Sequence, residues 1–163
     1  MASWGDVVRE APALAGSARR CFDAHKHKVL ATLRADGSPR LSGIEATFVA
    51  GDLWLGMMDQ SRKAEDLQRD ARLVLHSATA DPEMADGDAK LAGRAVEIDD
   101  PAMRQALVAA QGNPPRDDTA EPFHLFRVDI SELVVTGLGG DPPDHLVIET
   151  WREGHGITRV ERR

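Results

Sequence analysis

The stretch KVLATLRADGSPRLSGIEATFVAGDLWLGMM, residues 28–58, decides the fold class. It contains three apolar runs, and two turn signals, Asp36-Gly37 and Gly51-Asp52, separate them. An Asp-Gly pair between apolar runs is the strongest short-range signal for a β-hairpin. The pattern therefore predicts three consecutive antiparallel strands, at 28–33, 41–49 and 53–58.

The rest of the chain continues this pattern of short strands. We expect five more strands, followed by a short apolar segment at 157–160, and three helices. Pro12 lies inside the first helical pattern, so that helix starts near Pro12 or consists of two short pieces. About eight short strands with regular turns predict a mainly β, closed or nearly closed antiparallel barrel with helices at its ends. The further strands are expected at 73–77, 91–98, 123–130, 133–138 and 146–151, and the helices at 6–27, 61–70 and 101–111.

Length and composition limit the possible classes of protein. A chain of 163 residues fits one domain, here an N-terminal helical segment (1–27) and a barrel (28–163). The net charge of −7 and an aromatic content of 4% disfavour nucleic-acid binding. No apolar run reaches the ~20 residues of a membrane span, and no signal peptide is visible. A single cysteine, Cys21, cannot form an intrachain disulfide, so we expect a cytoplasmic protein in which Cys21 is a core thiol.

Common catalytic and metal-binding motifs are missing from the sequence. It has no Walker loop, complete dinucleotide fingerprint, nucleophile elbow or paired cysteines. The six histidines show no spacing typical of metal ligands, so we expect no metal. Only by their location are His76 and Glu45 candidates for a proton donor, and no catalytic residue is assigned. The loop from Gly112 to Pro122 is either a mobile flap or a long connection.

Ser61-Arg62-Lys63 is the most informative motif, because it opens a helix directly after a strand. A helix start offers unpaired N–H groups and the positive end of the helix dipole, both of which favour a phosphate. Arg62 adds a planar donor group, Lys63 an ammonium and Ser61 a hydroxyl. The motif indicates a phosphate-bearing ligand. The alternative is that these three residues are ordinary solvent-exposed polar residues at a helix start.

A wider pattern resembles the pyridoxamine-phosphate-oxidase-like split-barrel family over roughly residues 24–163. It comprises the Asp-Gly hairpin, Trp54, Ser61-Arg62-Lys63 with the segment 67–72, and the closing segment 148–160. In that family a Ser-x-Lys run precedes Asn-Leu and Arg-Asp-Pro-Arg. This chain departs from the family by having Asp66 before Leu67 and Ala71 where proline is usual.

The resemblance implies a split barrel of six to eight strands, forming a homodimer with the cofactor at the interface. The cofactor would be FMN or the deazaflavin coenzyme F-420, and the resemblance leaves both open. Three residues of the pattern also have a structural alternative: Trp54 as a core residue, Gly43 as a bulge, and Arg159 in a surface pair with Glu149 or Glu161. The implied contacts are Ser61, Arg62 and Lys63 at the phosphate, Ser42 and Gly43 beside the ring, and Trp151 and Arg159 from the closing segment.

The function implied is that of an oxidoreductase which transfers hydride from the reduced cofactor to a small unsaturated or planar substrate. One alternative is a non-catalytic flavin- or haem-binding protein on the same barrel, with His76 or His124 as an axial ligand to haem. Another is an interaction module without a cofactor. The sequence does not name the substrate.

Overall fold

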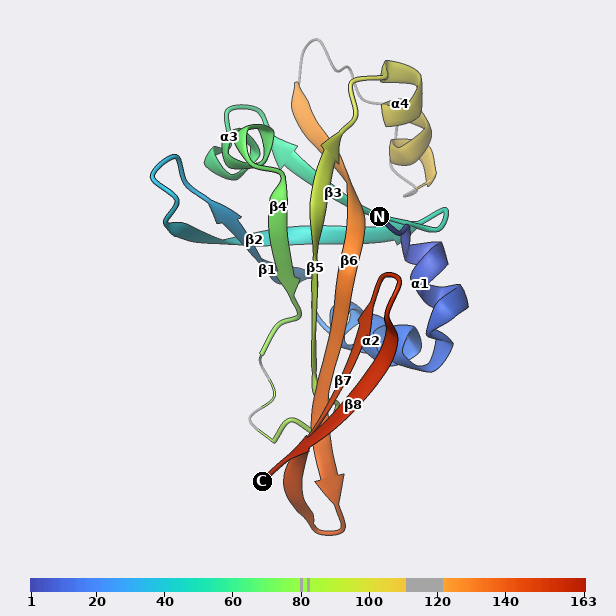
Figure 1. Ribbon diagram of the computed structural model, residues 1–163. Coiled ribbons are helices and arrows are strands. Elements are labelled where there is room, and N and C mark those ends of the chain that lie inside the picture. Colours follow the sequence, from blue (N-terminus) through green and yellow to red (C-terminus); the bar gives the residue numbers. More distant parts are fainter. Residues whose placement is uncertain (80, 82, 111–121) are drawn as a thin grey trace.

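The computed structural model describes residues 1–79, 81, 83–110 and 122–163, and most of these form one antiparallel sheet (Figure 1). The described part of the chain has eight strands and four helices. The strands are β1 (His27–Leu33), β2 (Pro39–Val49), β3 (Asp52–Met58), β4 (Arg72–His76), β5 (Asp88–Glu97), β6 (Phe123–Gly140), β7 (Pro143–Arg152) and β8 (Gly156–Arg162). The helices are α1 (Trp4–Glu10), α2 (Pro12–Asp23), α3 (Arg62–Arg69) and α4 (Pro101–Ala110).

The sheet closes on itself over six of its strands. The order is β3-β2-β1-β4-β5-β6-β7-β8, and a further pairing of β3 with β6 closes the barrel. Strands β7 and β8 continue outward from the far half of β6, so they form an extension below the barrel in Figure 1. The predicted fold class, a mainly β split antiparallel barrel, is confirmed.

Two expectations about the elements were wrong. Segments 123–130 and 133–138 are one strand, β6, and the segment 157–160 lies within β8. Strand β6 stays continuous because Ser131 forms a β-bulge. Across β5, Ala92 is opposite Glu132 whereas Gly93 is opposite Ile130. The extra residue reverses the inward-outward alternation, which the sequence pattern alone shows as a break between two strands.

The first helical pattern divides into two helices, as Pro12 allowed, so the structure has four helices instead of three. Ser3 caps α1 in a capping box with Asp6, and Pro12 begins α2. Proline is tolerated in a first helical turn because its missing N–H has no partner there anyway. Apart from Pro122, the loop 112–122, expected to be either a flap or a long connection, lies outside the described residues.

The main core lies inside the barrel and continues beneath α1 and α2. These helices bury Trp4, Leu14 and Phe22 against the sheet, and Cys21 is buried with them, as expected of a core thiol. A second, smaller cluster of Trp54, Leu107 and Leu125 lies beneath α4. Within the described ranges, no helix is long and apolar enough to cross a membrane.

Helix α3 is held on the barrel by a buried carboxylate, Asp66, whose side chain is only 3% exposed. It accepts hydrogen bonds from Thr32 Oγ1 of β1 (2.8 Å), Arg40 Nε of β2 (2.6 Å) and Arg69 on α3 itself (2.9 Å). Burial raises the pKa of Asp66, but the hydrogen bonds from Arg40, Arg69 and Thr32 outweigh it and lower the pKa to about 2. Asp66 therefore joins α3 to the β1–β2 hairpin.

The opposite side of α3 is joined to β5. Gln68 Nε2 donates to both carboxylate oxygens of Glu97, at 2.9 and 3.2 Å. Between these two attachments, Ala64 and Leu67 are buried in the main core. Helix α3 is consequently fixed from both sides, and its first turn has a defined place beside β2.

We predict that Asp66→Asn lowers the free energy of unfolding at pH 7 by about 2 kcal/mol, because the lowered pKa reports stabilisation of that order. A carboxyl whose pKa is depressed on folding stabilises above its unfolded pKa, and this contribution is lost as the pH falls through about 2. The difference in the free energy of unfolding between wild type and Asp66→Asn should therefore shrink to roughly half by pH 3. Urea unfolding at several pH values measures this difference.

Glu65→Gln is the matched control on the same helix. Glu65 pairs with Arg62 at an exposed site, where ion pairs contribute little, so this change should cost less than about 0.5 kcal/mol. If the two variants were equally stable at pH 7, Asp66 would not be what holds α3 on the barrel.

Candidate cofactor-binding site

The barrel is split where β2 and β3 separate. These two strands are paired only over Ala46–Val49 of β2, whereas β1 is paired with β2 from Pro39 to Glu45. Beyond this point β3 turns away and pairs with β6. The edge of β2 over residues 41–45 therefore has no strand partner on its β3 side within the described chain. This free edge can interact with side chains from elsewhere.

The first turn of α3 lies at this edge. Ser61 is the N-cap, as predicted, and its hydroxyl oxygen accepts a hydrogen bond from the Ala64 N–H at 3.3 Å. The other N–H groups of the first turn have no partner within the helix, and the helix dipole adds positive potential there. This turn is suited to bind an anion.

Lys63 connects α3 to the free edge of β2. Its ammonium Nζ donates a hydrogen bond to the carbonyl oxygen of Gly43 at 2.9 Å. The structure therefore brings together two of the predicted site residues, Lys63 and Gly43, that lie 20 positions apart. Arg62, the neighbouring cation, is 77% exposed and pairs with Glu65 at 3.1 Å.

Lys63 differs from the other cations around α3, because no carboxylate of the described residues pairs with it. Arg69 and Arg40 share Asp66, and Arg72 pairs with Asp70. Lys63 has only the neutral carbonyl group of Gly43. An anionic ligand at the first turn of α3 could therefore take Lys63 without breaking an ion pair.

Gly43 and Ser42 lie on opposite faces of β2. Gly43 is opposite Val29 and faces outward, and no atom would come within 4 Å of a Cβ added to it. The register between β1 and β2 is regular here, so Gly43 does not mark a bulge. Ser42 is half-buried opposite Leu30, whose side chain faces the barrel interior. The space beside the Gly43 backbone is open, which suits a flat ring system approaching the strand.

An apolar surface surrounds Gly43 on the outside of the barrel. We call it the outer patch; it is spread over β1, β2 and β4, whose outward residues are paired across the strands. Leu41 is 71% exposed, and Val29 and Val74 are each 39% exposed. Outward apolar residues that adjoin on three neighbouring strands form a candidate interaction surface. The outer patch consists of Val29, Ala31, Leu41, Gly43 and Val74.

The two predicted site residues of the closing segment lie elsewhere in the chain. Trp151 of β7 is fully buried in the main core, and its indole N–H donates to Glu10 Oε2 at 3.0 Å. In this structure Trp151 has no exposed surface through which to contact a cofactor, so the cofactor contact stays a prediction. Arg159 lies on β8 and pairs with Glu161 at 3.3 Å, one of the two surface pairs considered from the sequence.

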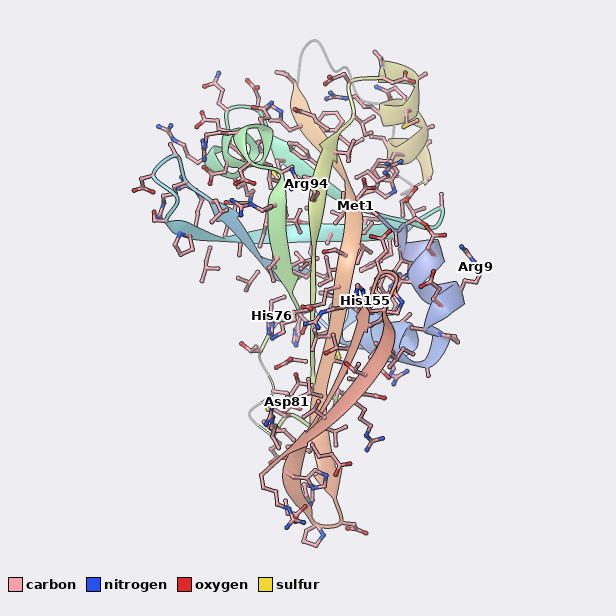
Figure 2. All side chains as sticks on the ribbon, viewed as in Figure 1. Met1, Arg9, His76, Asp81, Arg94 and His155 are labelled. Carbon is pink, nitrogen blue, oxygen red and sulfur yellow. The ribbon has the colours of Figure 1, made fainter. Side chains whose placement is uncertain are left out.

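The two candidate proton donors lie on β4 and β2. His76, labelled in Figure 2, is opposite Val29 on the outer face of β4, and its Nδ1 is 2.7 Å from the Ser77 carbonyl oxygen. Glu45, in the middle of β2 opposite the start of β1, pairs with Lys26 at 3.1 Å. His76 therefore borders the outer patch, and Glu45 is engaged at the surface.

A cluster that sequence analysis missed lies on the other side of α3. His124, at the start of β6, has its Nδ1 2.7 Å from Glu97 Oε1 and its Nε2 3.8 Å from Asp59 Oδ1. Gln68 of α3 completes the cluster through Glu97. The four residues come from four separate segments, so no local spacing could have shown them. No group of acidic, histidine or cysteine residues in the described ranges could hold a metal ion.

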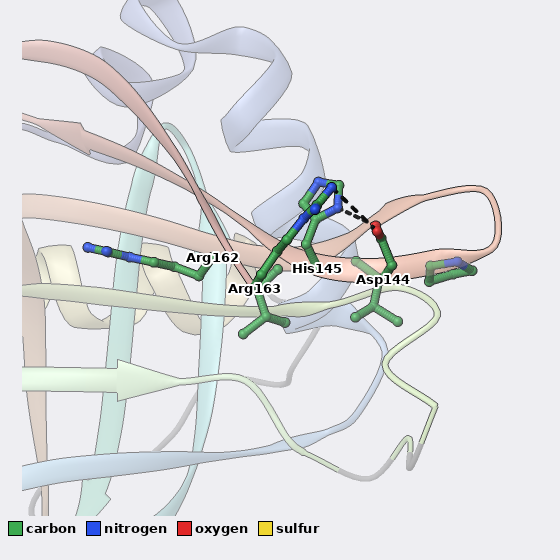
Figure 3. A pocket seen from close by; sticks show the side chains of 7 residues that line it. Asp144, His145, Arg162 and Arg163 are labelled. Carbon is green, nitrogen blue, oxygen red and sulfur yellow. Dashed lines mark hydrogen bonds and ion pairs between the residues drawn. The ribbon is translucent and has the colours of Figure 1, made fainter.

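A hollow of about 430 Å³ lies far from α3, at the end of the β6–β7 hairpin (Figure 3). Its polar groups are largely paired already, since Asp144 binds His145 at 2.6 Å and Arg163 at 3.6 Å. Arg162 also lines this hollow, but among the described residues no helix starts beside it, unlike the site at Lys63.

Comparisons with known proteins agree with this architecture. Residues 14–136 match the family model described as pyridoxamine 5'-phosphate oxidase. No curated protein sequence matches the chain. One similar solved structure is a pyridoxamine 5'-phosphate oxidase-related, FMN-binding protein from Nostoc punctiforme, with 16% identity over 100% of this chain and 98% of that chain (TM-score 0.63).

A second similar structure is PhzG from Burkholderia lata in complex with tetrahydrophenazine-1-carboxylic acid. It is 16% identical over 96% of this chain and 90% of that chain, with a TM-score of 0.60. At this level of identity, both structures support the fold. The family match covers more than half of the sequence. The chain therefore belongs to the pyridoxamine 5'-phosphate oxidase family.

Proposed function

We propose that this protein is an oxidoreductase that binds FMN or the deazaflavin coenzyme F-420 at the split of the barrel. The observation that carries the proposal is the ammonium of Lys63, which lies at a helix start and, among the described residues, bonds the neutral carbonyl group of Gly43 and no carboxylate. Family membership supports a flavin-type cofactor. When bound, the cofactor would supply hydride to a small unsaturated or planar substrate.

The residues around the split would divide the work of holding the cofactor. Lys63, Arg62 and the Ser61 hydroxyl would bind its phosphate, together with the free N–H groups of α3. Gly43 would let the ring lie close to the backbone of β2, with Ser42 next to it in the strand. We assign a catalytic role to no acid or base of the described residues, because the place of the substrate beside the cofactor is not part of the proposal.

We predict that Lys63→Ala weakens cofactor binding at least tenfold, which is about 1.4 kcal/mol. A phosphate loses a charge-assisted hydrogen bond, whereas the folded protein loses one exposed bond to a carbonyl group. Titration of the purified protein with FMN and separately with F-420, followed by tryptophan fluorescence, measures the dissociation constants. The thermal midpoint should stay within a few degrees of wild type.

Lys26→Ala is the matched control, since Lys26 is an exposed lysine whose ammonium pairs with the Glu45 carboxylate and not with Gly43. It should leave both dissociation constants unchanged. Equal affinity of wild type and Lys63→Ala for both cofactors would remove Lys63 from the site. Binding of neither cofactor by wild type would contradict the proposed cofactor itself.

We further propose that the protein is a homodimer whose copies meet through the outer patch. The patch is apolar, includes Gly43, and would place the cofactor between the two copies. We predict that Leu41→Glu converts the dimer into a monomer, because two carboxylates would be buried opposite each other. Sedimentation measures this change. Met103→Glu, on the exposed face of α4, should leave the dimer intact; a monomeric wild type would refute the proposal.

In such a dimer we propose that Arg159 serves the partner's site, since β8 carries it away from α3 of its own chain. Mixed dimers test this. Co-expression of Lys63→Ala with Arg159→Ala would give one intact site per mixed dimer if Arg159 acts across the interface, and none if it acts within its own chain. We predict that half of the sites in such mixed dimers regain wild-type affinity. Wild-type affinity of the Arg159→Ala homodimer would leave Arg159 a surface residue.

A further inference from the structure

His124 lies between two carboxylates at the barrel end covered by α3. Its Nδ1 is within hydrogen-bond distance of Glu97 (2.7 Å), and its Nε2 faces Asp59 at 3.8 Å. Its side chain is 19% exposed and stacks on Phe126 at a centroid distance of 6.2 Å. Among the described residues, Asp59 and Glu97 are the charged groups that face it, and Gln68 of α3 is its uncharged polar neighbour.

The two contacts respond differently to a proton on the ring. Glu97, a carboxylate, can only accept, so Nδ1 carries the hydrogen in the neutral ring. The Nε2 lone pair then faces the Asp59 carboxylate, which is unfavourable. When the ring is protonated, Nε2 also becomes a donor and Asp59 becomes its ion-pair partner. Protonation of His124 would therefore favour its contact with Asp59 at 3.8 Å, and deprotonation would weaken that contact.

Asp59 belongs to the turn that leads into the candidate site. The next residue, Gln60, has a φ of 58°, a left-handed conformation that a residue with a side chain adopts only rarely. Ser61, the N-cap of α3, follows directly, and its N–H donates to the Met58 carbonyl oxygen at 3.3 Å. A strained turn of this kind persists only where its neighbours hold it, and Asp59 supplies one such contact.

We propose that His124 is a proton-dependent positioning residue for the first turn of α3, so that an anionic cofactor binds more tightly when His124 is protonated. The proposal rests on the proposed function for the identity of the ligand. The effect of His124 on the turn at Asp59 does not depend on that function. The positive charge gained by His124 on protonation would also favour an anionic cofactor. It would offset the negative charges of Asp59 and Glu97 near a bound phosphate.

The first test needs no cofactor. Hydrogen exchange of the backbone amides of residues 59–64, corrected for the intrinsic pH dependence of exchange, is compared at pH 5.5 and pH 8. We expect protection in wild type to be about fivefold higher at pH 5.5, and protection in His124→Gln and Asp59→Asn to be the same at both. His145→Asn is the matched control, because His145 has an equivalent pair with Asp144 at 2.6 Å, far from α3.

The second test measures the dissociation constants of FMN and F-420 at the same two pH values. We expect wild type to bind about fivefold more tightly than His124→Gln at pH 5.5 and equally at pH 8. Titration of the FMN phosphate itself is common to all variants and cancels in this comparison. Asp59→Asn keeps His124 and provides the second variant.

The outcomes separate the two proposals. Protection of 59–64 that is equally independent of pH in wild type and His124→Gln overturns the role of His124, whatever the cofactor does. Protection that depends on His124, in a protein that binds neither cofactor, supports the role of His124 and refutes the proposed function. A pH dependence that His145→Asn also removes would mean a general effect of surface histidines, and would overturn the proposal too.

Discussion

The candidate site depends on one buried anion, the carboxylate of Asp66. A charge removed from water must find partners, and Asp66 finds them on β1, on β2 and on its own helix. Lys63 lies three positions earlier on α3, so both side chains project from the same side of the helix. The constraint that buries Asp66 against the β1–β2 hairpin therefore also presents Lys63 to the free edge of β2.

The sequence was sufficient for features that depend on neighbouring residues. Alternating apolar residues and the Asp-Gly turn indicated the strands, Pro12 allowed for two helices, and Ser61 marked the start of α3. Features that depend on pairing between distant segments were not predictable in this way. The bulge at Ser131 reverses the strand pattern, so one strand looked like two. His124 meets Glu97 only because β5 and β6 end side by side at α3.

Trp151 illustrates a different limit. Its place in a segment that resembles the family suggested a cofactor contact, yet a tryptophan on an alternating strand also suits a core, and here the core prevails. The net charge of −7 likewise describes only an average. Around α3, carboxylates pair with Arg40, Arg62, Arg69 and Arg72, whereas no carboxylate of the described residues pairs with Lys63. A local site for an anion can thus exist on an acidic protein.

The bulge at Ser131 limits how this chain can change in length. Inward residues of β6 run through Ile130 and then resume at Leu133, which packs with Trp151 against the helices. Deleting one residue here would rotate the whole β6–β8 extension by half a turn, exposing its buried face and burying its charged one. Related chains should therefore accept insertions in the hairpin loops, but at the bulge only changes that preserve this parity.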